Sequence, residues 1–146
     1  MSLIARKTIL ALTLLLILFD AASLTAAEKK TIFYNLTTDE AWTAGMALNQ
    51  ASKAIEHGYK VVVFLNVRGV LLASKAFHSD SFVASALSLQ DMLQANMKEG
   101  AKVIVCPMCM KKVGLTQEDL IKGIEMGGPD VTLKAMTADD TVVISY

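Results

Sequence analysis

The sequence predicts an α/β domain of three layers, in which helices cover both faces of a mainly parallel sheet of about five strands. Strand-like and helix-like segments alternate along the chain, and two nearly continuous apolar runs, residues 60–67 and 101–106, suit strands that are buried on both faces. The segments between them are long enough for the crossover helices that parallel strands require. The length of 146 residues predicts a single domain of this kind.

The first half of the domain is predicted to form a strand, a helix and a second strand. Residues 32–36 are mostly apolar and rich in β-forming types, and a polar break follows them. Asp39 is the expected N-cap of a helix that runs to about His57, with Gly58 as its left-handed cap. The apolar run over residues 60–67 is the second strand.

The middle of the chain is predicted to hold a second helix and a third strand. Residues 68–79 indicate only a loop with a short helical turn. A longer helix is expected over residues 80–98, with a break near Ser88, because "SLQD" has the pattern of a capping box. The apolar run over residues 101–106 is the next buried strand.

Two helices and a last strand are expected in the final part of the chain. Thr116 is the predicted N-cap of a helix, with Asp119 three positions later, and this helix ends at "GG" near residue 128. Pro129 then opens a short helix that runs to about Thr137. The segment "DTVVISY" closes the chain as a strand.

The N-terminus has the pattern of a secretory signal peptide. Arg6 and Lys7 precede an apolar run over residues 8–19, and small residues then suit cleavage after Ala26 or Ala27. The run is shorter than the roughly 20 apolar residues that a membrane-spanning helix needs. We therefore expect no stable membrane span once the signal is cleaved, with a retained N-terminal anchor as the alternative.

Cleavage there divides the chain into a signal peptide, residues 1–27, and the α/β domain, residues 28–146. We expect an exported protein, located in a bacterial periplasm. The chain carries 14 basic and 14 acidic residues without a basic stripe, which argues against a nucleic acid partner. Its two cysteines are too few for a disulfide framework, so they are free to serve chemistry.

Both cysteines, Cys106 and Cys109, lie in the segment "VIVCPMCMKK" at the end of a predicted strand. In parallel α/β folds, functional groups gather outside the carboxyl ends of the strands. Nearby backbone N–H groups, the charges of Lys111 and Lys112, and the second cysteine each favour a thiolate on Cys106. A structural disulfide explains the pair less well, because closing so short a loop contributes only about 2 kcal/mol.

The run "CPMCMKKVG" resembles the DsrE/DsrF-like sulfur-relay family, whose members include the TusD-type sulfur carriers. That family has a cysteine at the end of a central strand, then a basic pair and a glycine. Cys106, Lys111, Lys112 and Gly114 fall at or beside these positions. The resemblance extends to the strand "TIFYNLT", the expected helix "EDLIKGIEMGG" and the closing "DDTVVISY".

This resemblance implies a Rossmann-like α/β/α domain with a persulfide on Cys106 and no cofactor. It also implies a homo-oligomer, a trimer or a hexamer, and a protein partner that donates or accepts sulfur. Two features depart from the family pattern. The best-known relay members are cytoplasmic, and the single-cysteine carriers lack the CPxC motif that Pro107 and Cys109 create here.

The second cysteine leaves the function open between sulfur carriage and thiol–disulfide exchange. Cys109 is placed to attack a persulfide on Cys106, to release the outer sulfur and to close a disulfide. The sequence therefore indicates a sulfur-handling protein with Cys106 as nucleophile and Cys109 as the resolving thiol. Lys111, Lys112 and Gly114 are supporting residues, and the sequence does not decide between a carrier and an enzyme.

Binding of a soft metal is an alternative. Cys106, Cys109, Met108 and Met110 offer the thiolate and thioether ligands that select Cu(I). Packing in the core is the simpler explanation of the two methionines. No resident metal is therefore expected.

Three further alternatives are weaker. A tetrahedral zinc site would need His57 and His78 as additional ligands, although His57 is expected as an exposed helix cap. A thioredoxin-like fold is disfavoured, because the CxxC follows a late strand and only Pro129 lies elsewhere in the chain. A non-catalytic oligomeric assembly module would use Trp42 and Phe77 at its interfaces, although we expect both in the core.

Overall fold

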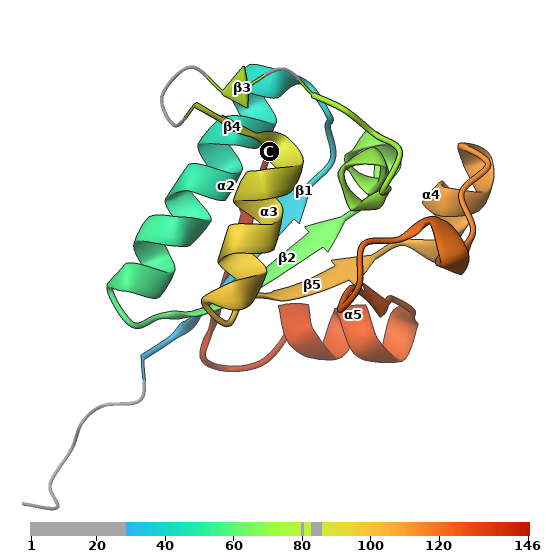
Figure 1. The fold of residues 1–146 in the computed structure, drawn as a ribbon. Coiled ribbons are helices and arrows are strands. Elements are labelled where there is room, and N and C mark those ends of the chain that lie inside the picture. Colours follow the sequence, from blue (N-terminus) through green and yellow to red (C-terminus); the bar gives the residue numbers. More distant parts are fainter. Residues whose placement is uncertain (1–28, 80, 83–85) are drawn as a thin grey trace, which may run out of the picture.

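A computed structural model describes residues 29–79, 81–82 and 86–146 of the chain. These residues form a parallel sheet of five strands with helices on both faces (Figure 1). The predicted three-layer α/β architecture is thereby confirmed. In spatial order the strands are β6 (Glu125–Met126), β5 (Lys102–Val105), β2 (Lys60–Leu65), β1 (Thr31–Leu36) and β7 (Thr141–Ser145).

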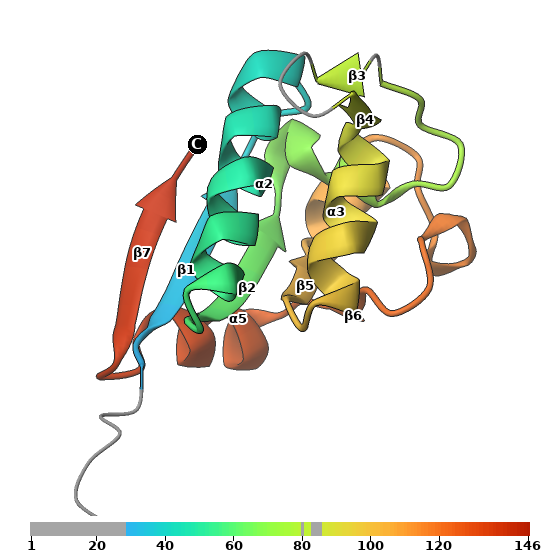
Figure 2. The same cartoon turned by 60° about the vertical axis from the view of Figure 1, so that its left-hand side comes forward.

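Helices α2 (Ala41–Glu56) and α3 (Leu89–Lys98) lie side by side on one face of the sheet, and α5 (Pro129–Met136) lies on the other (Figure 2). Alternate strand residues face the two layers. Tyr34 belongs to the larger core cluster, together with buried residues of α2 and α3, whereas its neighbour Phe33 belongs to a smaller cluster beside α5. The central strands are therefore buried on both sides, as their apolar sequences predicted.

The start of α2 differs from the prediction. Glu40, and not Asp39, is the N-cap, because its carboxylate accepts the N–H groups of Trp42 and Thr43, each at 2.8 Å. Asp39 instead forms an ion pair with Arg68. Trp42 is 67% exposed, so the expectation that it lies in the core was wrong.

Between β2 and α3 the chain forms a short 3-10 helix and a small hairpin. The prediction of a helix over residues 80–98 was wrong at 81–82 and 86–88, since α3 begins only at Leu89 and Ala86 has a φ of +54°, while residues 80 and 83–85 lie outside the described residues. Ser88 of the expected capping box "SLQD" is confirmed as the N-cap, because its Oγ accepts the N–H of Asp91 at 3.1 Å. The connecting elements are η1 (Val67–Ala73), β3 (Ser81–Phe82) and β4 (Leu87–Ser88).

The helix predicted over residues 116–128, which includes the segment "EDLIKGIEMGG", was wrong. The expected capping box of Thr116 and Asp119 is present, but it opens only one 3-10 turn, η2 (Gln117–Asp119). Beyond that turn, the N–H of Ile121 donates to a carbonyl at the end of η1 at 2.8 Å, and β6 pairs with β5. These bonds to other segments use the backbone groups that a helix would need.

The remaining predictions concern the last helix and strand of the chain and its N-terminal segment. The short helix after Pro129 and the closing strand are confirmed as α5 and β7. The expected signal peptide over residues 1–27 lies outside the described residues. Across residues 29–79, 81–82 and 86–146, no helix combines the length and the apolar character needed to cross a membrane.

Candidate functional site

Cys106 lies at the carboxyl end of β5, where the sequence predicted it. Its backbone N–H donates to the carbonyl of Leu65 at 2.9 Å, which extends the pairing of β5 with β2 by one residue. Cys106 is also the N-cap of the short helix α4 (Pro107–Lys112). Pro107 occupies the first turn of this helix, where the missing N–H costs nothing.

The two cysteines contact one another across the first turn of α4. The backbone N–H of Cys109 donates to Cys106 Sγ at 3.3 Å, and both residues are half-buried free thiols. The sulfur of Cys106 thus takes the role that a serine or aspartate oxygen has at most helix starts. This hydrogen bond fixes the Cys106 sulfur at the start of the helix.

Cys109 has a different environment. Burial raises the pKa of the Cys109 thiol, and its hydrogen bond to Cys106 raises the pKa further. The backbone N–H of Val67 has a smaller, opposite effect on the pKa. Cys109 therefore stays protonated at neutral pH, while Cys106 receives the hydrogen bonds.

The segment beside Cys109 has strained backbone geometry. Val67, the first residue of η1, has a φ of +50°, which is unfavourable for a β-branched residue. Gly69 is packed against the end of β1, where an added Cβ would lie only 2.3 Å from the carbonyl oxygen of Leu36. Backbone strain of this kind often occurs at functional sites.

Polar contacts that sequence reasoning missed hold η1 to the ends of the strands. Asn66 Nδ2 donates to Asn35 Oδ1 at 2.6 Å, and Asn35 Nδ2 donates to Ser145 Oγ at 3.2 Å. Arg68 forms two hydrogen bonds with the carboxylate of Asp39, at 2.6 and 2.8 Å. Two asparagines at or near the ends of apolar strands were a sequence signal for the hydrogen bonds between Asn66, Asn35 and Ser145. No sequence pattern indicated the ion pair of Arg68 and Asp39.

Each cysteine faces its own surface hollow. The hollow beside Cys106 has a volume of about 460 Å³ and lies between α4 and α5. The hollow beside Cys109 has a volume of about 600 Å³ and lies between α4 and η1. Met108 lines both hollows and is 80% exposed. Met108 is therefore the side chain that the two hollows share.

The predicted supporting residues lie at the far end of α4. Lys111 and Lys112 occupy its last turn and are exposed, which favours the helix because its carboxyl end is electronegative. Lys112 lines the hollow beside Cys109, whereas none of the described residues that line the hollow beside Cys106 is charged. Gly114 follows with a φ of +77°, a conformation that glycine adopts without strain.

The four sulfur ligands of the metal alternative are split between core and surface. Met110 is buried in the main core cluster, so core packing is confirmed for this residue. The same expectation was wrong for Met108, which is exposed. Among the described residues, no group of three or more His, Cys, Asp or Glu side chains is arranged to hold a metal ion.

The histidines considered for a zinc site lie in other places. His57 is the exposed C-cap of α2, as expected. His78 Nδ1 contacts the carbonyl of Ala76 at 2.8 Å. It lines a separate polar hollow of about 490 Å³, and neither cysteine lines this hollow. The half-buried Phe77 lines it too and packs against the main core.

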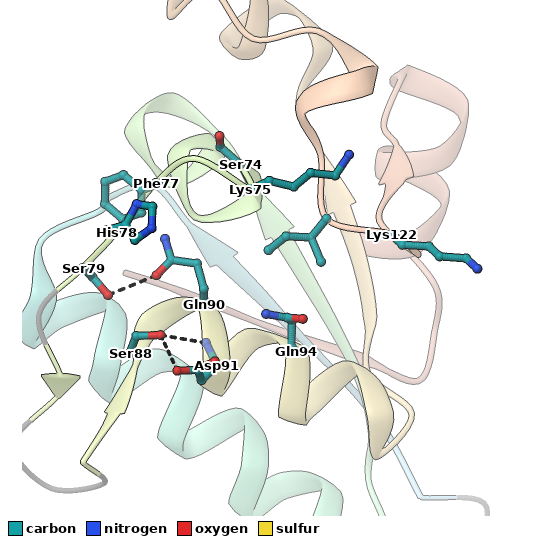
Figure 3. A pocket seen from close by; sticks show the side chains of 11 residues that line it. Ser74, Lys75, Phe77, His78, Ser79, Ser88, Gln90, Asp91, Gln94 and Lys122 are labelled. Carbon is teal, nitrogen blue, oxygen red and sulfur yellow. Dashed lines mark hydrogen bonds between the residues drawn. The ribbon is translucent and has the colours of Figure 1, made fainter.

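Figure 3 shows that this third hollow is organised around the start of α3. Ser79 Oγ accepts the N–H of Leu89 at 2.8 Å and donates to Gln90 Oε1 at 3.1 Å. Ser88 Oγ donates to the carboxylate of Asp91 at 2.7 Å. Most of these polar groups cap the helix, so the hollow is explained by the architecture of α3 rather than by sulfur chemistry.

The sequence model of the DsrE/DsrF-like family matches residues 29–144 of this chain. The chain is also similar to two uncharacterised archaeal proteins, each over 97 residues and 66% of this chain. Identity is 33% to the protein of Methanopyrus kandleri, of which 77% is covered, and 35% to that of Methanocaldococcus jannaschii, of which 82% is covered.

Solved structures support the same fold. The ychN protein of E. coli matches with a TM-score of 0.64 and 18% identity, over 80% of this chain and 99% of that protein. The protein of unknown function MTH1491 from Methanobacterium thermoautotrophicum matches with a TM-score of 0.62 and 12% identity, over 81% of this chain and 99% of that protein. At such low identity these structures establish the fold alone.

Proposed function

This chain belongs to the DsrE/DsrF-like family, and we propose that it carries sulfur as a persulfide on Cys106, with Cys109 as the thiol that discharges it. The family indicates a function related to sulfur relay. The single observation that supports the assignment to Cys106 is the hydrogen bond from the Cys109 N–H to its sulfur. That bond fixes the position of the Cys106 sulfur at the start of α4, beside a surface hollow.

Loading is a transfer of sulfane sulfur. The Cys106 thiolate attacks the outer sulfur of a persulfide donor, RS–SH, and a new bond forms between Cys106 Sγ and that sulfur. The donor's S–S bond breaks, and the thiolate RS⁻ leaves with the electron pair. Cys106 then carries the persulfide, and no external oxidant or reductant is consumed.

Discharge uses the second cysteine. The Cys109 thiolate attacks Cys106 Sγ, the outer sulfur leaves as hydrosulfide, and a disulfide joins the two cysteines. An external thiol then reduces this disulfide and restores both cysteines. Because burial and the contact with Cys106 raise the pKa of Cys109, its thiolate is scarce at neutral pH, so the loaded state is long-lived.

We extend the proposal to location and partners. The signal-like N-terminus supports export to the periplasm, where the protein would meet a donor or acceptor protein. A homo-oligomer, a trimer or a hexamer, is part of the proposal by family resemblance. Whether turnover is catalytic or stoichiometric depends on how fast a thiol reduces the disulfide.

The Cu(I) alternative would need a rearrangement of α4. Met110 is 2% exposed and would have to leave the core to join Met108 and the two cysteines around one ion. Sulfur carriage needs no such movement, because the Cys106 sulfur already lines a surface hollow. We therefore favour sulfur carriage.

Intact mass spectrometry tests the proposal. The purified protein, Cys106→Ser and Cys109→Ser are reduced, desalted and exposed to a persulfide donor. We expect the mass of one added sulfur in the wild type and in Cys109→Ser, and none in Cys106→Ser. Absence of any gain in all three proteins would rule out sulfur carriage.

A further inference from the structure

The hollow beside Cys106 is built from uncharged side chains. Pro107 and Met108 line it from α4, and Leu133 lines it from α5. Among the described residues that line it, only Thr132 has a hydroxyl group and none is charged.

The hollow beside Cys109 has the opposite character. Arg68 and Lys112 line it, and within the described part of the chain an ion pair is found for Arg68, with the carboxylate of Asp39. An anion that approaches Cys109 therefore meets two cationic side chains. The same anion at Cys106 meets a lining of mostly apolar side chains, and an apolar surface cannot replace the hydration that a charge loses there.

We propose that the hollow beside Cys106 binds the organic group of the persulfide donor, and that this group is apolar and uncharged. This inference rests on the proposed function, because it assigns the donor's R group to the hollow that holds the attacking sulfur. A volume of about 460 Å³ lies within the range of roughly 300–1,000 Å³ typical of small-molecule sites. An aromatic or alkyl R group would bury its apolar surface against Leu133 and Met108.

The assignment follows the atoms of the loading step. The outer sulfur of RS–SH must reach Cys106 Sγ, so the R group lies within two bonds of the transferred sulfur. When the S–S bond breaks, RS⁻ leaves with the electron pair and takes a proton from water. The R group then leaves through the open side of the hollow.

A pair of matched donors tests this inference. Benzyl persulfide and 4-carboxybenzyl persulfide differ by one carboxylate and deliver the same sulfur. With the reduced Cys109→Ser protein, we measure the rate at which each donor adds one sulfur. We expect the uncharged donor to react at least about tenfold faster, because the carboxylate would be desolvated in the hollow.

Two lysine substitutions on α5 sharpen the test, both made in the Cys109→Ser protein. Leu133→Lys places a cation at the hollow, and Leu133 is 57% exposed, so the change is compatible with the fold. We expect Leu133→Lys to reduce the preference to about threefold or less by favouring the carboxylate donor. Val131→Lys is the matched control, since Val131 is an exposed apolar residue of α5 that does not line the hollow. This variant should keep the donor preference of the parent Cys109→Ser protein.

The outcomes separate the inference from the proposed function. Equal rates for both donors at Cys106 would overturn the inference and leave sulfur carriage intact. No reaction with either donor would overturn both. The oligomeric mass of each variant is measured in parallel. If Leu133→Lys dissociates an oligomer and changes both rates equally, the hollow is an interface between copies and the inference is wrong.

Discussion

The backbone N–H of Cys109 donates a hydrogen bond to Cys106 Sγ at 3.3 Å, so the two cysteines are not equivalent. Cys106 accepts hydrogen bonds at the carboxyl end of a central strand. Cys109 is half-buried, and this burial raises the pKa of its thiol. This difference is the basis for assigning attack to Cys106 and discharge to Cys109.

The titration of Cys109 is expected to depend on Cys106. In Cys106→Ala, the hydrogen bond that raises the pKa of Cys109 is lost while burial remains, so the pKa of Cys109 should fall. Peptide-resolved alkylation rates measured against pH give this value in the variant and in the wild type. An unchanged or higher pKa in the variant would show that the two thiols do not interact.

The ion pair of Asp39 and Arg68 gives a pH-dependent contribution to stability. The hydrogen bond from Arg68 holds the pKa of Asp39 below its usual value. The pKa of Asp39 is therefore lower in the folded state than in the unfolded state, where an Asp carboxyl has a pKa of about 3.9. The ion pair contributes its full stabilisation above the unfolded-state pKa, and this stabilisation is lost as the pH falls through the folded-state pKa.

Asp39→Asn should accordingly lower the free energy of unfolding by about 0.5–1 kcal/mol at neutral pH, because Arg68 is largely exposed and water screens the pair. The difference from the wild type should stay constant down to about pH 5 and shrink below about pH 4. Urea unfolding at several pH values measures it. A difference that persists unchanged in acid would contradict the role of the ion pair.

The close approach of Gly69 to Leu36 predicts a severe cost for any side chain at this position. In Gly69→Ala the new Cβ would lie 2.3 Å from the carbonyl oxygen of Leu36, so η1 must shift. We expect a loss of at least about 2 kcal/mol in the free energy of unfolding. Gly128→Ala is the control, because no atom lies within 4 Å of its added Cβ. Equal stability of both variants would contradict this packing.

The two methionines of α4 predict a contrast within one helix. Met110 is 2% exposed, so Met110→Ala should cost about 2–5 kcal/mol through the cavity that it leaves. Met108 is 80% exposed, so Met108→Ala should change stability by less than about 0.5 kcal/mol. Chemical denaturation of both variants measures the difference. A similar cost for both would mean that α4 is oriented differently.

The apolar pattern predicted the parts of the fold that depend on burial. The runs that became β2 and β5 were identified because strands buried on both faces are apolar throughout. The location of Cys106 at the carboxyl end of a strand was predicted because it is the last residue of such an apolar run. The start of α3 was marked by Ser88, whose local capping contact does not depend on the rest of the fold.

Other features depend on contacts between distant segments. The segment 116–128 carries a genuine helix start at Thr116, yet pairing with η1 and β5 decides its structure. Likewise, the hollow beside Cys106 exists because the fold brings Leu133 of α5 to the same hollow as Pro107 and Met108 of α4. Such placements leave no local sequence pattern.

The most direct test of the central claim is the location of the sulfur after loading. The reduced protein and its two cysteine-to-serine variants are exposed to a persulfide donor, alkylated and analysed by peptide mass spectrometry. The account predicts a long-lived persulfide on Cys106 in Cys109→Ser, and slow conversion of that persulfide to a Cys106–Cys109 disulfide with release of hydrosulfide in the wild type. A persulfide that forms on Cys109 when Cys106 is replaced by serine would contradict the account.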